Sequence, residues 1–404
     1  MGLDEDSALD LIDDSPGELE PVGAEGEDDL DALDPKTLSQ AVVFATDWTA
    51  ETILRQLERG NIQMNPKYQR RDAWRGQRKS RFIESVFLGL PIPQIVLAEA
   101  KSKRGSYIVI DGKQRLLTIR QFAAQKDDTE YDQLKLSGLE IRKDLQGKSL
   151  LDLEKDPSSQ ADVAAFQNQT IRTVVLRNWP NENFLYLVFL RLNTGSVQLS
   201  PQELRQALHP GPFIDFVIER SGNSDGLKRL LKSKQPDFRM RDVELLVRYY
   251  AFRNFLPEYT GSLKAFLDGT CKVLNQEWDH RKSELESQAR EFELALGATF
   301  SIFGANACRK SDGEQYEARL NRAVFDIMVY YFSFVKIRDA AVAKANDVEK
   351  AFRAICQGNS GFIRSIEATT KSLLATESRL RIWGEALSRV LQITVSIPKV
   401  GPAN

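Results

Sequence analysis

The residues best suited to chemistry stand where a predicted strand passes directly into a predicted helix, at Asp111-Gly112-Lys113-Gln114-Arg115. The first turn of a helix presents unpaired N–H groups and a partial positive charge, which suit a phosphate group. A glycine lets the backbone approach a ligand closely, and Lys113 and Arg115 add cationic donors. Asp111 can hold Mg²⁺ or orient a water molecule. The alternative is an ordinary tight turn whose aspartate caps the helix.

A basic stretch further upstream has the composition of a nucleic-acid contact. Seven basic residues between Lys67 and Arg81 are interleaved with Tyr68 and Trp74. Basic side chains contact phosphate groups, and aromatic rings can stack on bases. The alternative is a solvated helix face with Trp74 in the core. The DNA contacts predicted in this stretch are Tyr68, Gln69, Arg71, Arg75 and Lys79.

Other motifs offer less. Asn193 at the end of a predicted helix is a natural C-terminal cap, and Glu203 is explained by a capping box with Ser200. Only two histidines are present, too few for a His-Asn-His nuclease pattern, and we expect both to be structural or solvated. The three cysteines form no CxxC pair and are predicted to be buried thiols.

Hydrophobic periodicity places these residues on an α/β unit followed by an all-helical region. We expect order to begin near Val42 and amphipathic helices to continue to about Gln392. Short strands are predicted at 61–64, 95–99, 107–110 and 170–176. Helices are predicted at 50–59, 76–88, 113–125, 182–193, 201–208 and 241–255.

Charge is divided unevenly along the 404 residues. The net charge is −2, but residues 1–34 hold 14 acidic and no basic residues, so the remainder is basic and suits a polyanion. We expect a disordered acidic tail, which either keeps the chain soluble, docks a partner or competes with DNA for the basic surface. No apolar run approaches the ~18 residues of a membrane span, and a cytoplasmic protein without membrane contact is predicted.

Taken together and in this order, the motifs resemble the N-terminal domain family of GmrSD-type restriction endonucleases. The family has a YQR segment, an IES…PIP segment, a DGQQR loop and an FxxxN element. The corresponding segments here are Tyr68–Arg70, Phe82–Pro93, Asp111–Leu116 and Phe189–Asn193, with further similarity at Leu199–Arg205 and Arg241–Arg248. Lys113 is a departure, because the family usually has glutamine at that position.

The resemblance implies an α+β chain with a ParB/sulfiredoxin-like domain at residues 41–180. A helical domain at 181–395 would follow, between disordered ends at 1–40 and 396–404. It also implies that an NTP, either ATP or GTP, binds at the DGQQR loop with Mg²⁺. Asp111, Gln114 and Arg115 would be catalytic, and Asp111 would also hold the metal. The nucleotide contacts would be Gly112, Lys113, Arg70 and Asn193.

Three functions compete at this point. The first is an NTP hydrolase that gates DNA recognition or cleavage in a bacterial anti-phage restriction module. The second is a non-catalytic DNA- or nucleotide-sensing subunit that controls a separate nuclease or toxin. The third is a scaffold whose site has decayed, against which the intact Asp111–Arg115 loop argues. Two histidines cannot supply the His-based nuclease domain that many relatives carry, and whether the chain forms a homo-oligomer stays open.

Overall fold

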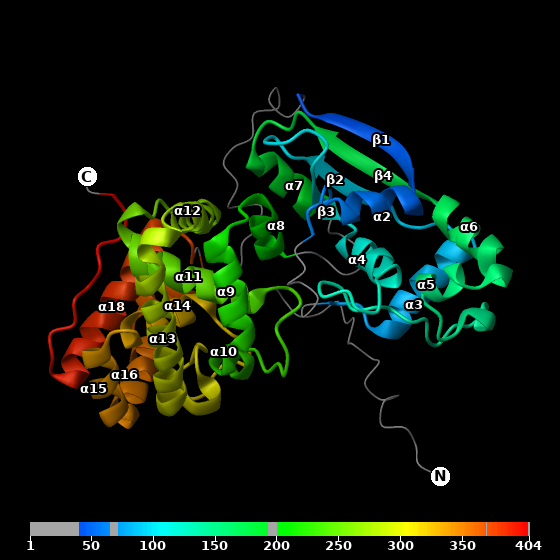
Figure 1. The fold of residues 1–404 in the computed structure, drawn as a ribbon. Coiled ribbons are helices and arrows are strands. Elements are labelled where there is room, and N and C mark those ends of the chain that lie inside the picture. The colour runs from blue at the N-terminus through cyan, green and yellow to red at the C-terminus, as the bar shows by residue number, and fades with distance from the viewer. Residues whose placement is uncertain (1–39, 65–71, 193–199, 369, 403–404) are drawn as a thin grey trace, which may run out of the picture. The chain divides into compact units, whose positions relative to one another are not determined.

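The computed structural model describes residues 40–64, 72–192, 200–368 and 370–402 (Figure 1). These residues form two compact units. The sheet-bearing unit extends to residue 255 and includes 262–293, and the helical unit comprises 256–261 and the chain from 294 onward. Helices between residues 181 and 255 therefore pack in the same compact unit as the sheet.

A four-stranded mixed sheet is the centre of the sheet-bearing unit (Figure 1). Its order is β1 (Val42–Thr49), β4 (Thr170–Arg177), β2 (Ile95–Glu99) and β3 (Tyr107–Asp111). The outer pairs β1–β4 and β2–β3 are antiparallel, whereas β2 and β4 run parallel. In place of the strand predicted at 61–64, Ile62 forms an isolated bridge with Tyr107.

Helices cover both faces of this sheet, because successive side chains of a strand point to opposite faces. Ile95, Leu97, Val109 and Val175 belong to one core cluster, which they form with residues of α2 (Ala50–Glu58), α3 (Gly76–Phe87), α4 (Lys113–Phe122) and α6 (Gln160–Asn168). The alternate positions 96, 98, 108 and 110 form the second cluster with α7 (Glu182–Leu192) and α8 (Pro201–Leu208). This layering, together with the helices that follow, confirms the predicted α+β class.

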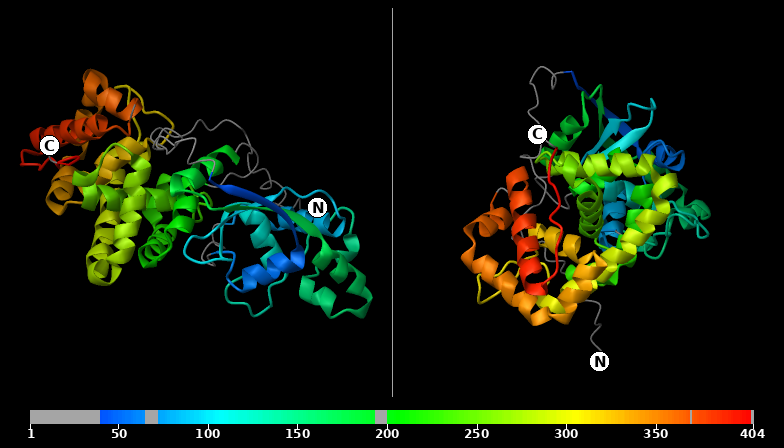
Figure 2. Two further views of the ribbon diagram at one scale, coloured as in Figure 1. Left: turned by 90° about the horizontal axis from the view of Figure 1, so that it is seen from above. Right: turned by 90° about the vertical axis from the view of Figure 1, so that its left-hand side faces the viewer.

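The rest of the described chain is almost wholly helical (Figure 2). No helix among the described residues is long and apolar enough to cross a membrane. In the helical unit, the buried Trp383 packs edge-on against Phe352, with ring centroids 5.5 Å apart. All three cysteines are free and buried, as predicted. The remaining α-helices are α5 (Leu150–Glu154), α9 (Pro212–Asn223), α10 (Asp225–Leu230), α11 (Arg241–Phe255), α12 (Leu263–Gln276), α13 (Trp278–Phe303), α14 (Arg322–Phe332), α15 (Val335–Ala343), α16 (Ala345–Gly358), α17 (Ser360–Glu367) and α18 (Leu373–Leu391).

Glu84, which belongs to the IES…PIP segment, has a structural role that its helical position does not predict. Glu84 of α3 is 5% exposed, and its Oε1 accepts hydrogen bonds from the backbone N–H groups of Ile141 (2.9 Å) and Arg142 (2.7 Å). Burial by itself would raise the pKa of Glu84, but the N–H groups of Arg142 and Ile141 outweigh it and lower the pKa below 4.5. The carboxylate therefore fastens a distant loop to α3.

We predict that Glu84→Ala releases this loop. Charge-assisted hydrogen bonds contribute about 1.5–3 kcal/mol, so amide exchange at residues 139–146 should accelerate roughly 10- to 100-fold in hydrogen-exchange mass spectrometry. Because the folded pKa is lowered, the same loosening should appear in the unaltered protein as the pH falls below 4.5. The exposed Glu154→Ala is the matched control. Unchanged exchange in Glu84→Ala would contradict the assignment.

Candidate functional site

Gly112 forms the junction between β3 and α4 and occupies the N-cap position of the helix. Its φ of +96° lies in the left-handed region, and a Cβ atom there would lie 3.0 Å from Cγ1 and 3.3 Å from Cα of Ile95. Gly112 has no side chain with which to cap the helix, and the carboxylate of Asp111 pairs with Arg115. Because its N-cap residue is a glycine, α4 begins without a side chain of that residue over its first turn, the position that a phosphate group takes at a helix N-terminus.

Asp111 and Arg115 form an ion pair across this turn. Nη2 of Arg115 lies 2.8 Å from Oδ2 of Asp111 and also donates to the carbonyl oxygen of Gln94 at 3.0 Å. The Arg115 side chain is only 10% exposed, whereas that of Asp111 is 36% exposed. Arg115 therefore orients the aspartate and the neighbouring backbone, and Asp111 is the member of the pair that a ligand or water molecule can reach.

Lys113 points to a different partner from the one expected. Its Nζ lies 2.7 Å from Oε1 of Glu203, and both side chains are buried. Glu203 also accepts the N–H of Ser200 through Oε2 at 2.8 Å, which completes the predicted capping box of α8. Glu203 thus both caps α8 and pairs with Lys113. The ammonium group of Lys113, expected beside the phosphate groups, contacts Glu203.

The loop also contains Gln114, whose Oε1 atom is buried and has no hydrogen-bond partner among the described residues. Asn193, the other residue expected at the nucleotide, lies outside the part of the chain that the structure describes, as do Tyr68, Gln69, Arg70 and Arg71. The site as described therefore consists of the Asp111–Arg115 turn and its contacts with α8.

The described part of the basic stretch is divided between surface and core. Arg75 is exposed at the start of α3. Lys79 is buried, and its ammonium group contacts the carboxylate of Asp72 and lies 2.7 Å from Oε1 of Gln121, so its position does not favour the predicted contact with DNA. Trp74 packs edge-on against Phe82, with ring centroids 5.6 Å apart. Arg75 is the N-cap residue, which precedes the first helical turn, whereas Lys79 lies within α3 on its buried face.

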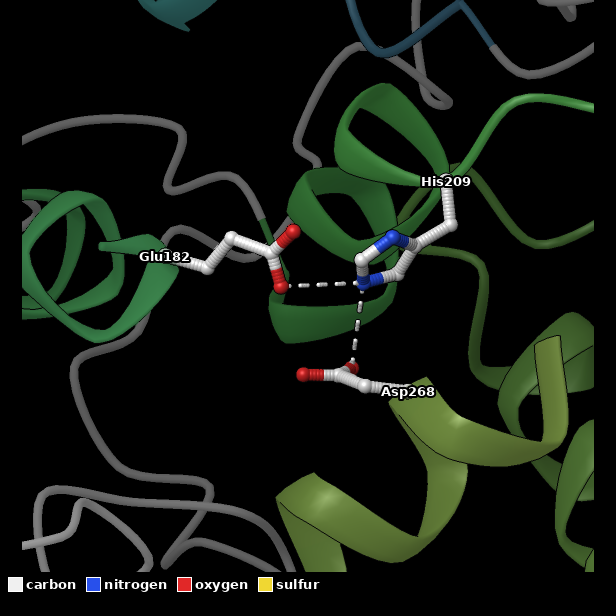
Figure 3. Close-up of side chains that lie close together, drawn as sticks. All are labelled: Glu182, His209 and Asp268. Carbon is white, nitrogen blue, oxygen red and sulfur yellow. Dashed lines mark ion pairs between the residues drawn. The ribbon is translucent and has the colours of Figure 1, made fainter. Parts of the chain in front are cut away.

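A cluster of ionisable side chains, separate from the Asp111–Arg115 turn, was not predicted from the sequence. Glu182 at the start of α7, His209 at the end of α8 and Asp268 within α12 bring their side chains together in the sheet-bearing unit (Figure 3). Nε2 of His209 lies 3.6 Å from Oε2 of Glu182 and 4.0 Å from Oδ1 of Asp268. The three residues are far apart in the sequence, and no local motif joins them.

Burial determines the charge state of this cluster. The desolvation of His209 lowers its pKa below 6.5, although Asp268 and Glu182 oppose the shift. The imidazole is therefore neutral at neutral pH. Burial would raise the pKa of Asp268, but the charges of Arg205 and Lys264 outweigh it and lower the pKa below 3.8. Asp268 is consequently ionised beside a neutral histidine.

The comparison with known families identifies part of the chain. Residues 51–210 match the family described as the GmrSD restriction endonuclease, N-terminal domain. The match covers β2, β3, β4 and helices α3 to α8 and ends just after His209. No curated protein and no solved structure matches the chain.

We predict that Lys113→Ala destabilises the sheet-bearing unit by about 3–5 kcal/mol, because it leaves the buried Glu203 carboxylate without its cation. Lys113→Gln should lose markedly less, since an amide can still donate to Glu203. Urea unfolding followed by tryptophan fluorescence measures the difference. Equal stability of both variants and the unaltered chain would show that the pair contributes nothing.

Proposed function

We propose that this chain binds and hydrolyses a nucleoside triphosphate, ATP or GTP, at the Asp111–Arg115 turn. Nucleotide turnover would gate the recognition of DNA in a bacterial restriction-like module that defends against phage. The observation that carries the proposal is the N-terminus of α4, where a glycine in the left-handed region is the N-cap and leads directly from β3 into the helix. This turn lies within residues 51–210, which match the N-terminal domain family of GmrSD restriction endonucleases.

The proposed division of labour follows from exposure. The N–H groups of the first turn of α4 would hold phosphate oxygens, and the partly exposed Asp111 would hold Mg²⁺ or orient the attacking water. Arg115 would position Asp111 through their 2.8 Å ion pair. Gly112 would allow the close approach of the phosphate groups, which a Cβ atom beside Ile95 would hinder.

One observation favours a second candidate, a nucleotide-sensing subunit that controls a separate nuclease or toxin without catalysis of its own. Both cations of the loop already have carboxylate partners: Lys113 pairs with Glu203, and Arg115 pairs with Asp111. Phosphoryl transfer depends on cations that neutralise the developing charge. A loop with its cations paired in this way could bind a nucleotide and turn it over slowly or not at all.

Asp111→Asn separates the two candidates. The change preserves an acceptor for Arg115 and removes the charge, so we expect the hydrolysis of ATP or GTP to fall by roughly 10²- to 10⁴-fold, the usual contribution of a general base. The binding of a fluorescent nucleotide should change far less. The measurements are radiolabelled turnover, with and without DNA, and fluorescence titration of both proteins.

Asp127→Asn, which removes the same charge from an exposed loop, is the control and should leave turnover unchanged. Binding without turnover in the unaltered chain would favour the sensing subunit. The absence of any nucleotide binding at millimolar concentration would overturn both candidates.

The DNA part of the proposal has its own test. Arg75→Ala should weaken DNA binding and lower the slope of log K against log salt concentration by about 0.9, the value expected for one lost phosphate contact. Lys155→Ala removes a comparable exposed charge at the C-cap of α5 and should leave the slope unchanged. Equal slopes in all three proteins would remove Arg75 from the DNA surface.

A further inference from the structure

His209 presents a buried nitrogen with an unusual environment. Its side chain is 4% exposed, and Nε2 has no hydrogen-bond partner among the described residues. The nearest carboxylate oxygens, at 3.6 Å from Glu182 and 4.0 Å from Asp268, are too distant for direct hydrogen bonds. Leaving a buried polar atom unsatisfied is costly and uncommon in folded proteins. The arrangement therefore points to a ligand between the three side chains.

The spacing fits a metal ion. The three ligand atoms lie within 4.8 Å of one another. Zinc binds histidine nitrogen and carboxylate oxygen at about 2.0–2.2 Å, which places neighbouring ligand atoms about 3.4 Å apart in a tetrahedron. Closure around an ion thus needs shifts of under about 1 Å. We propose that Glu182, His209 and Asp268 form a binding site for a first-row transition-metal dication, with zinc the best match to one imidazole and two carboxylates.

The surrounding charges determine how strong such a site can be. Arg205 donates to Oδ1 of Asp268 at 2.7 Å, and Lys264 donates to Oδ2 at 2.8 Å. Lys272 lies 3.0 Å from Oε2 of Glu182. Such partners orient ligating carboxylates, but their positive charges also repel a dication.

Lys272 is the cation that can leave the site. Its side chain is 49% exposed, so it can turn into solvent when an ion binds. Arg205 and Lys264 are buried and stay in place. The site should therefore bind zinc with moderate affinity and discriminate against Mg²⁺, which prefers an all-oxygen environment and gives up its water reluctantly.

A metal at this point would tie three helices together. Glu182 comes from α7, His209 from the end of α8 and Asp268 from α12, while the other end of α8 holds the Glu203 partner of Lys113. With three protein ligands the ion would retain one open coordination position. The inference does not depend on nucleotide binding, because none of its residues belongs to the Asp111–Arg115 turn.

The two histidines of this 404-residue chain allow a direct test by NMR spectroscopy of their ring C–H groups. Titration with ZnCl₂ should shift the signal of His209 and leave that of the exposed His280 unchanged. His209→Ala and His280→Ala assign the two signals. MgCl₂ at the same concentration should move neither. A zinc-dependent change at His280 alone, or at neither residue, would overturn the proposal.

Calorimetric titration of the variants gives the second readout. We expect His209→Ala to weaken zinc binding by more than about 100-fold and His280→Ala to leave it unchanged. Lys272→Ala should tighten binding by roughly 3- to 10-fold, because it removes a competing positive charge near the ion. A gain in affinity cannot arise from misfolding, so this variant keeps the test valid even if His209→Ala is unstable. Unchanged or weaker binding in Lys272→Ala would contradict the assigned geometry.

Discussion

Buried charges need partners of opposite sign, and the sheet-bearing unit depends on such pairs. The ion pair between Lys113 and Glu203 is the central case. Both side chains are buried, and their nitrogen and oxygen lie 2.7 Å apart. Neither charge could stay in this environment alone, because the loss of one partner leaves an uncompensated ion away from water. The pair therefore fixes the position of α8 relative to the turn that follows β3.

An ion pair between buried side chains also connects α8 to α12. Arg205, two residues after Glu203, is almost fully buried and contacts Asp268, which Lys264 also contacts. His209 follows at the end of α8 and lies beside the same aspartate. One short helix thus takes part in both the proposed nucleotide site and the proposed metal site.

The sheet explains why the chemistry lies at the ends of its strands. The two helical layers bury the side chains of β2 and β3 on both faces, apart from partly exposed residues at the strand ends such as Asp111. Polar groups can therefore meet a ligand only where a strand ends, and Asp111 is the last residue of β3. Gly112 then turns the chain into α4 in a conformation that other residues rarely adopt. Local chemistry and global packing agree at this junction.

The sequence by itself determined the local elements and the Asp111–Arg115 turn. Helix α11 and the capped start of α8 at Ser200 are set by neighbouring residues, through helical periodicity and capping, and the structure has them where they were predicted. The edge strand β1 was not predicted, because Val42, Val43 and Phe44 show no alternation and become a strand only by pairing with β4. Tertiary structure alone decided the partners of the charged residues: the burial of Lys79, the pairing of Lys113 with Glu203, and the meeting of Glu182, His209 and Asp268. Electrostatic partners are chosen by distance in space, and residues such as Lys113 and Glu203, 90 positions apart in the sequence, become neighbours only when helices pack.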